Sequence, residues 1–109
     1  LVRAAEPIEG VEMMRKLRKT GGPRPEPERT ICSGPGRLCA AMAIDRAFTG
    51  IDLAHHEGLW NEPAPEPVAA EQIAVTPRIG IDYAGDWVDK PLRWYVRSSE
   101  AVSRVPKRR

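Results

Sequence analysis

The chain has 109 residues, 41% of them hydrophobic, and a formal net charge of +2 at pH 7, which suits one small domain and excludes two. With 9 glycines, 11 prolines and a small net charge, the composition fits neither a low-complexity chain nor an intrinsically disordered one. No apolar run approaches the roughly 18 residues of a membrane span, and no N-terminal segment resembles a signal peptide. Because the chain opens at Leu1 without an initiator Met, we expect a piece of a longer protein.

The first half of the chain predicts a strand end followed by two helices. Residues 1–5 are apolar enough for a strand end, which the Glu-Pro pair at 6–7 stops. Residues 9–19 have helical spacing, with acids early and cations late, as the helix dipole favours. After a loop rich in glycine and proline, Ser33, Gly34 and Pro35 predict a capped helix start, and the helix continues through Ile44. The apolar face of this second helix is formed by Leu38, Cys39, Met42 and Ala43.

The second half of the chain predicts two strands. Residues 61–68 contain three prolines and form an extended acidic loop. Apolar and small or polar residues alternate over 79–82 and again over 92–97, which is typical of half-buried strands, and a turn anchored by Trp87 separates the two. We therefore predict an α+β fold with antiparallel strand pairing. The apolar face of the second strand is formed by Leu92, Trp94 and Val96.

Charge is segregated along the chain although it nearly balances overall. Residues 15–46 hold eight basic and three acidic residues, and residues 90–109 hold seven basic residues against Glu100 alone. Residues 52–76 between them hold five acids and no Lys or Arg. This pattern suggests two basic lobes that touch a polyanion, but because the net charge is small, composition alone favours solvated helix faces with a basic tail.

The cysteines and histidines do not have the spacing of a metal site. Cys32 and Cys39 stand seven residues apart, and the two histidines, His55 and His56, are adjacent to each other. We therefore expect no metal and no cofactor. The cysteines are more typical of small core residues in a reducing compartment, and the histidines of a protein surface.

Four motifs, in order along the chain, resemble the mammalian-type 3-methyladenine (alkyladenine) DNA glycosylases. Residues 1–15 are similar to the family's "LLRAxEPxEGxExM" segment, and residues 32–44 to its "CSGPxKLCxALxI" segment. Residues 77–87 (PRIGIDYAGDW) and 90–97 (KPLRWYVR) extend the resemblance. It implies a curved antiparallel sheet or open barrel with flanking helices. Residues 1–101 would be the carboxy-terminal half of this larger single domain, followed by a basic tail over 102–109.

The activity implied by the resemblance is that of a monofunctional DNA repair glycosylase. Such an enzyme flips an alkylated or deaminated purine out of double-stranded DNA and hydrolyses the N-glycosidic bond, which leaves an abasic site. Alkylation at N3 or N7 makes the purine cationic, so an aromatic pocket can select it, and the remaining task is to position and deprotonate a water. The implied protein is a monomer in a reducing compartment that contains DNA, either the cytoplasm with its nucleoid or the nucleus.

Particular residues match the family's functional positions. The arginine that holds the nucleophilic water matches Arg3, and the main-chain carbonyl that accepts from this water matches Ile79. Two alternatives stay open: Arg3 as a buried strand arginine paired with Glu6 or Glu9, and Arg37 as a solvated helix cation. The positions that the resemblance places at the DNA are Ser33, Gly34, Arg37, Arg46 and Gly80.

Other parts of the family's site are absent from this sequence. The general-base glutamate, the residues that sandwich the flipped base and the wedging tyrosine all precede the first motif in the family. Asp82 and Tyr83 stand where the family has Gly-His. We therefore expect these 109 residues alone to bind DNA weakly and to excise nothing. The alternatives are a noncatalytic nucleic-acid-binding module of the same fold and a protein-interaction surface on the acidic loop at 63–67.

Overall fold

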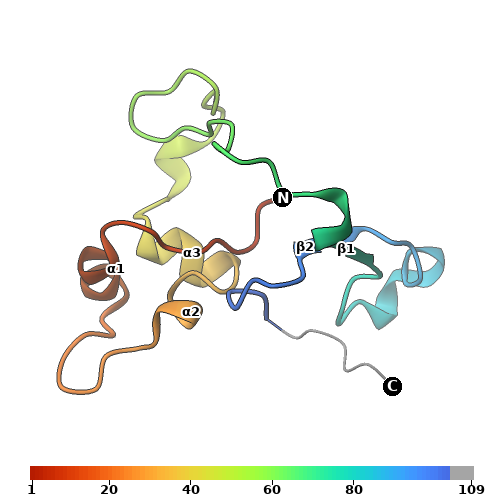
Figure 1. Ribbon diagram of the computed structural model, residues 1–109, viewed down its shortest axis with the longest axis horizontal. Helices are drawn as coiled ribbons and strands as arrows, with labels where there is room; N and C mark the ends of the chain where they lie inside the picture. Colours follow the sequence, from red (N-terminus) through yellow and green to blue (C-terminus); the bar gives the residue numbers. More distant parts are fainter. Residues whose placement is uncertain (104–109) are drawn as a thin grey trace.

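The computed structural model describes residues 1–103, with three short α-helices on one side and a two-stranded sheet on the other (Figure 1). The two strands pair antiparallel, which confirms the predicted α+β class and its antiparallel pairing. In chain order the elements are α1 (Val11–Arg18), α2 (Glu28–Ile31), α3 (Pro35–Ala41), η1 (Arg46–Phe48), η2 (Ala70–Gln72), β1 (Ile73–Thr76), η3 (Asp82–Trp87) and β2 (Arg93–Val96), where η denotes a 3₁₀ helix.

Helix α1 forms close to its predicted bounds. Gly10 precedes it in the left-handed conformation, with φ 74°, and the chain leaves the helix at Lys19, which is also left-handed. The N–H of Lys19 donates to the carbonyls of Arg15 and Lys16, so the last turn is closed. The early acid and late cations complement the helix dipole, as the sequence predicted.

The helical core is small and lies where α1, α2 and α3 meet. Ile31 and Cys32 are the largest side chains that are fully excluded from solvent. Cys32 Sγ lies 3.9 Å from Met14 Sδ, and burial raises the pKa of the Cys32 thiol, which keeps it protonated and apolar. The prediction of a core cysteine is confirmed for Cys32, whereas Cys39 is half-buried. The buried residues of this core are Ile31, Cys32, Leu38 and Ala41, with Val11 and Met14 packed against them.

Helix α3 begins where the sequence predicts it and ends earlier. Pro35 opens the helix after Gly34, although no side chain caps it. Ala43 adopts a left-handed φ of 53°, and the N–H of Ile44 turns back to the carbonyl of Cys39 at 2.8 Å. The expected extension of the apolar face through Met42 and Ala43 is therefore wrong, and Met42 is 43% exposed.

Of the two predicted strands, only the second is formed. The pairing partner of β2 is β1, so Ile73 stands opposite Val96 and Val75 opposite Trp94. The strand predicted over 79–82 is wrong, because Gly80 has a left-handed φ of 75° that breaks the extended chain before η3.

The amino-terminal segment is extended without forming a strand. Ala4 makes an isolated antiparallel bridge with Ser33, and the N–H of Ala5 donates to the carbonyl of Cys32 at 3.2 Å. The expected basic tail over 102–109 lies mostly outside the described residues. Among the described helices, none is long and apolar enough to cross a membrane.

Candidate functional site

Arg3 lies on an extended segment that is tied to the start of α3. The bridge between its neighbour Ala4 and Ser33 places Arg3 next to the turn at Gly34. The Arg3 side chain is exposed, and within residues 1–103 it forms no ion pair with Glu6, Glu9 or another carboxylate. The alternative of a buried, paired strand arginine is therefore wrong, and the guanidinium is available to an external group.

The turn before α3 requires glycine for conformational reasons. Gly34 has φ 127° and ψ 154°, a combination that residues with a Cβ rarely adopt. A Cβ built at this position would meet no atom within 4 Å, so the backbone here borders open space. A phosphate can therefore approach this turn closely, and Ser33 beside it is half-buried.

We expect Gly34→Ala to lower the free energy of unfolding by about 1–3 kcal/mol through backbone strain alone. Urea unfolding of the wild type and the variant measures the difference. Gly36→Ala is the matched control, because Gly36 lies inside α3, has no left-handed φ and also borders open space. Gly36→Ala is expected to raise the free energy of unfolding by about 0.5–1 kcal/mol. Similar effects of the two substitutions would contradict the strain at Gly34.

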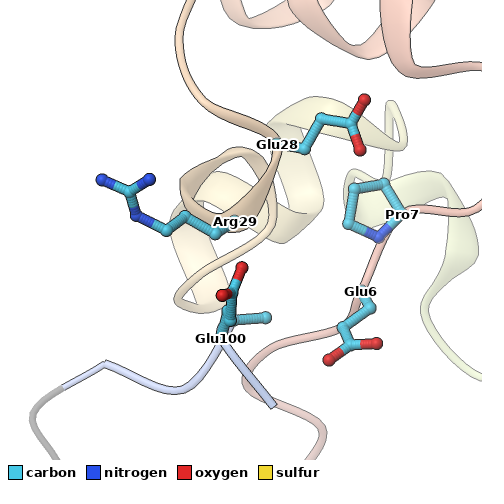
Figure 2. Close-up of a pocket in the computed structure, with 6 residues that line it drawn as sticks. Glu6, Pro7, Glu28, Arg29 and Glu100 are labelled. Atoms are coloured by element: carbon cyan, nitrogen blue, oxygen red, sulfur yellow. The ribbon is translucent and has the colours of Figure 1, made fainter.

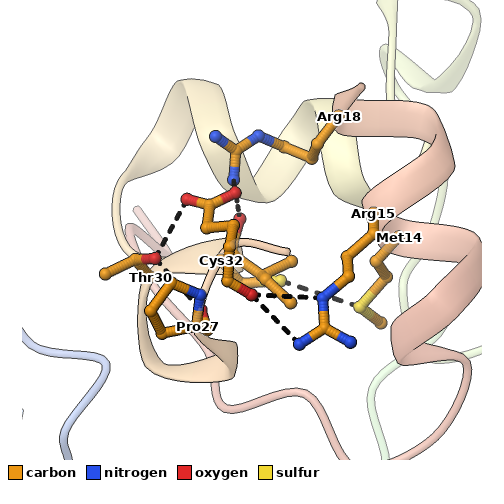
Figure 3. A network of polar contacts seen from close by, with 8 residues as sticks. Met14, Arg15, Arg18, Pro27, Thr30 and Cys32 are labelled. Atoms are coloured by element: carbon orange, nitrogen blue, oxygen red, sulfur yellow. Dashed lines mark hydrogen bonds and ion pairs between the residues drawn. The ribbon is translucent and has the colours of Figure 1, made fainter. Parts of the chain in front are cut away.

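Two cations of the first basic lobe are used inside the protein (Figure 3). Arg15 donates from Nε and Nη2 to the carbonyl of Glu26 at 3.1 and 3.0 Å. Arg18 donates from Nη1 to the carbonyl of Ile31 at 2.8 Å, and the same nitrogen lies 2.9 Å from Glu26 Oε2. These contacts hold α1 to the chain around α2, so neither arginine is free for a polyanion. The exposed cations of this lobe are Lys16, Lys19, Arg24, Arg29, Arg37 and Arg46.

Glu26 is held ionised by this network. Burial raises the pKa of Glu26, but the Thr30 hydroxyl, which donates to Oε1 at 3.0 Å, and the Arg18 guanidinium together lower it below its ordinary value of 4.5. A carboxylate with a lowered folded-state pKa stabilises the fold above its ordinary pKa, and this stabilisation is lost as the pH falls through the folded-state pKa.

We expect Glu26→Gln to lower the free energy of unfolding by about 1–3 kcal/mol at pH 7, because it removes charge-assisted hydrogen bonds. The difference from wild type should shrink as the pH falls below the ordinary pKa of 4.5. Denaturant unfolding at pH 7, 5, 4 and 3 measures it. Glu57→Gln serves as the control, since Glu57 is exposed and is expected to change stability little at any pH. A pH-independent penalty at Glu26 would contradict the electrostatic origin.

The predicted main-chain site at Ile79 lies in the turn between β1 and η3. The Ile79 side chain is 41% exposed, and no hydrogen bond among the described residues ends at its carbonyl. Gly80 is left-handed and borders open space, so the backbone can be approached closely there. This turn lies on the sheet side of the molecule, away from α3 (Figure 1). The structure thus brings Arg3 to Ser33 and Gly34, but no described polar contact joins Arg3 to Ile79.

The two histidines are used within their own loop. His55 Nδ1 lies 2.8 Å from Asp52 Oδ2, and this contact, with the N–H of Ala54, lowers the pKa of Asp52. His56 Nδ1 accepts the N–H groups of Gly58 and Leu59 at 3.0 and 3.1 Å. These contacts close a surface loop and favour the structural interpretation of both histidines.

A polar depression of about 280 Å³ lies between the amino-terminal segment, α2 and the carboxy-terminal segment (Figure 2). Figure 2 shows the carboxylates of Glu6 and Glu28 pointing apart, while the carboxylate of Glu100, on the carboxy-terminal segment, points toward Arg29. Its excess of acids is unfavourable to a phosphate. Within the described chain, no three His, Cys, Asp or Glu side chains form a group that could hold a metal ion. Sequence reasoning did not foresee this depression, which joins segments remote in the chain.

Comparison with known proteins finds similarity over almost the whole chain. Residues 1–100 match the methylpurine-DNA glycosylase family. The human DNA-3-methyladenine glycosylase is 44% identical over 109 residues, which cover 96% of this chain and 37% of that protein. For the mouse protein of the same name the identity is 46% over 110 residues, covering 96% and 33%. The putative 3-methyladenine DNA glycosylase of Methanocella arvoryzae is 44% identical over 104 residues, covering 95% and 48%. The chain therefore spans about a third to a half of the length of these curated relatives.

Proposed function

Because the chain belongs to the methylpurine-DNA glycosylase family, we propose that it is the carboxy-terminal half of a DNA repair enzyme that removes alkylated or deaminated purines from duplex DNA. The observation that carries this proposal is the match of residues 1–100 to the family. The names of the human and archaeal relatives support 3-methyladenine as the substrate class. The damaged purine leaves the base stack, since its glycosidic bond cannot be reached inside the duplex.

In the proposed reaction, Arg3 and the Ile79 carbonyl hold one water molecule beside a general-base carboxylate. The carboxylate, which the preceding half of the domain supplies, takes a proton from the water while the water oxygen attacks the anomeric carbon. The purine departs with the electrons of the N-glycosidic bond. The Arg3 guanidinium is exposed and forms no ion pair within residues 1–103, which supports its role, because its fixed charge and forked donors can bind both water and carboxylate. Arg3 and Ile79 are expected to converge in the intact domain.

The proposed DNA contacts lie around and after α3. Arg37 on α3 and Arg46 at the start of η1 are exposed, and Ser33 and Gly34 border open backbone at the helix start. Gly80 gives the duplex close access to the second turn. The proposed protein acts as a monomer in a reducing compartment that contains DNA. The two free cysteines support the reducing character of that compartment.

The function is tested with the complete protein that contains these 109 residues. It is incubated with a duplex that carries one 3-methyladenine analogue or hypoxanthine, and free base and alkali-labile abasic sites are measured. We expect release of the damaged base without strand cleavage before alkali, and no release by the 109-residue chain alone. If the complete protein binds the duplex but releases no base, the noncatalytic nucleic-acid-binding module is correct instead.

We expect the double variant Arg37→Ala, Arg46→Ala to bind all duplexes more weakly and with a shallower salt dependence. Each lost phosphate contact reduces the slope of log affinity against log salt by about 0.9, so the pair should reduce it by about 2. The slope is measured by binding titrations at salt concentrations from about 50 to about 200 mM, over which phosphate contacts change the affinity strongly. Arg15→Ala is the control, because Arg15 is engaged with Glu26 and should leave the slope unchanged. An unchanged slope in the double variant would remove both residues from the proposed interface.

A further inference from the structure

One face of the two-stranded sheet consists of apolar side chains only. The register places Ile73 opposite Val96 and Val75 opposite Trp94, and residues two apart on a strand share a face. These four residues, which we call the Trp94 face, include no charged or polar side chain. Val75 is 48% exposed and Trp94 is 71% exposed. Ile73 and Val96 are half-buried, so the uncovered part of this face is the pair Val75 and Trp94. Trp94 was expected in the apolar face of its strand.

The opposite face of the sheet is covered by the chain itself. Ala74 is buried at 1% exposure, and Tyr95 beside it is half-buried. The Arg93 guanidinium lies over the Tyr95 ring at 4.6 Å and donates from Nη2 to the carbonyl of Ser103 at 2.7 Å. The exposed apolar side chains of the sheet, Val75 and Trp94, therefore lie on one side only.

A two-stranded antiparallel ribbon is at best marginally stable in water unless further strands or a helix cover its apolar face. A large exposed apolar surface also marks a site at which another polypeptide packs. The family relatives have two to three times the length of this chain, since the matched region covers 33–48% of each of the three compared above. The length of polypeptide outside the match is therefore more than enough to cover the sheet.

We propose that the Trp94 face is the surface on which the preceding half of the same glycosylase domain packs. The proposal rests on the proposed function, in which this chain is the carboxy-terminal half of that domain. The face carries no charge, so its burial leaves no ion without a partner, and the matching surface is an apolar strand or helix face. Packing there would join the half that carries the general base to the half that carries Arg3 and Ile79.

The test compares two tryptophans in the complete protein by hydroxyl-radical oxidation read by mass spectrometry. Trp94 and Trp60 are both more than half exposed in this chain, and Trp60 lies in the loop that precedes the acidic prolines, outside both strands. If the preceding half covers the Trp94 face, the oxidation rate of Trp94 should be about one tenth of that of Trp60, or lower. Equal oxidation of the two would overturn the proposal.

Other occupants give different results in the same experiment. Protection of Trp94 that appears only at high protein concentration would assign the face to a second copy, and protection only with duplex DNA would assign it to the nucleic acid; either result overturns the proposal.

Trp94→Lys should also lower the ratio of folded to unfolded complete protein by about 100-fold, whereas Trp60→Lys changes it little. Base release is measured in parallel. A protected Trp94 in an inactive protein contradicts the proposed function alone, and an accessible Trp94 in an active one contradicts the docking surface alone.

Discussion

Arg3→Ala in the complete protein is expected to slow base excision by about 100- to 1,000-fold while duplex affinity changes little. The reason is that the Arg3 guanidinium is exposed and forms no ion pair within the described chain, so its loss leaves the fold intact. What is lost is a donor that holds the attacking water in line and that becomes more important as charge develops in the transition state. Single-turnover excision and equilibrium duplex binding measure the two quantities separately.

Two further variants determine whether the slower excision results from the loss of water positioning by Arg3. Arg24→Ala is the matched control, since Arg24 is an exposed arginine in the loop between α1 and α2, and we expect wild-type excision from it. Arg3→Lys keeps the charge without the planar fork and should recover only part of the rate. If Arg3→Ala weakened binding as much as it slowed excision, its role would be to bind DNA and not to position the water.

The elements that the sequence predicted are those with strong local signals. Helix α1 has acids early, cations late and glycine beyond, and its observed bounds differ from the prediction by two residues or fewer. Strand β1 was missed, because its four residues carry no alternation of polar and apolar types and become a strand only by pairing with β2. The alternation at 79–82 was misleading, since Gly80 permits the left-handed turn that the sequence pattern does not record.

The candidate site shows the same division between local and long-range information. Motif resemblance selected Arg3 and Gly34 separately, and only the bridge from Ala4 to Ser33 reveals that they are neighbours. Counting charges could not separate Arg15 and Arg18 from the other cations of the lobe, because their partners are carbonyls and a carboxylate up to 13 residues away in the chain. The Trp94 face, in turn, depends on strand register, which four-residue strands do not specify on their own.

The largest stability effect is expected at Ile31, at the end of α2. Its side chain is fully excluded from solvent, and its carbonyl accepts the hydrogen bond from Arg18 at 2.8 Å. Ile31→Ala should lower the free energy of unfolding of the complete protein by about 2–5 kcal/mol, since it removes apolar contacts and leaves a cavity. Within residues 1–103, the buried core that contains Ile31 has three other members, Cys32, Leu38 and Ala41, so few neighbours can move in to fill that cavity.

Denaturant unfolding of a graded series tests the role of Ile31 in the core. Ile31→Val removes one methylene and should lower the free energy of unfolding by about 0.5–1.5 kcal/mol. This loss is smaller than that of the alanine variant, because valine leaves a smaller cavity. Val68→Ala is the control, because Val68 is 46% exposed in the proline-rich segment and should cost less than about 0.5 kcal/mol. Cys32 and Ser33 follow Ile31 directly, so a collapsed core would also displace the bridge that brings Arg3 to α3. If Ile31→Ala cost no more than Val68→Ala, the three helices would not be held together by this core.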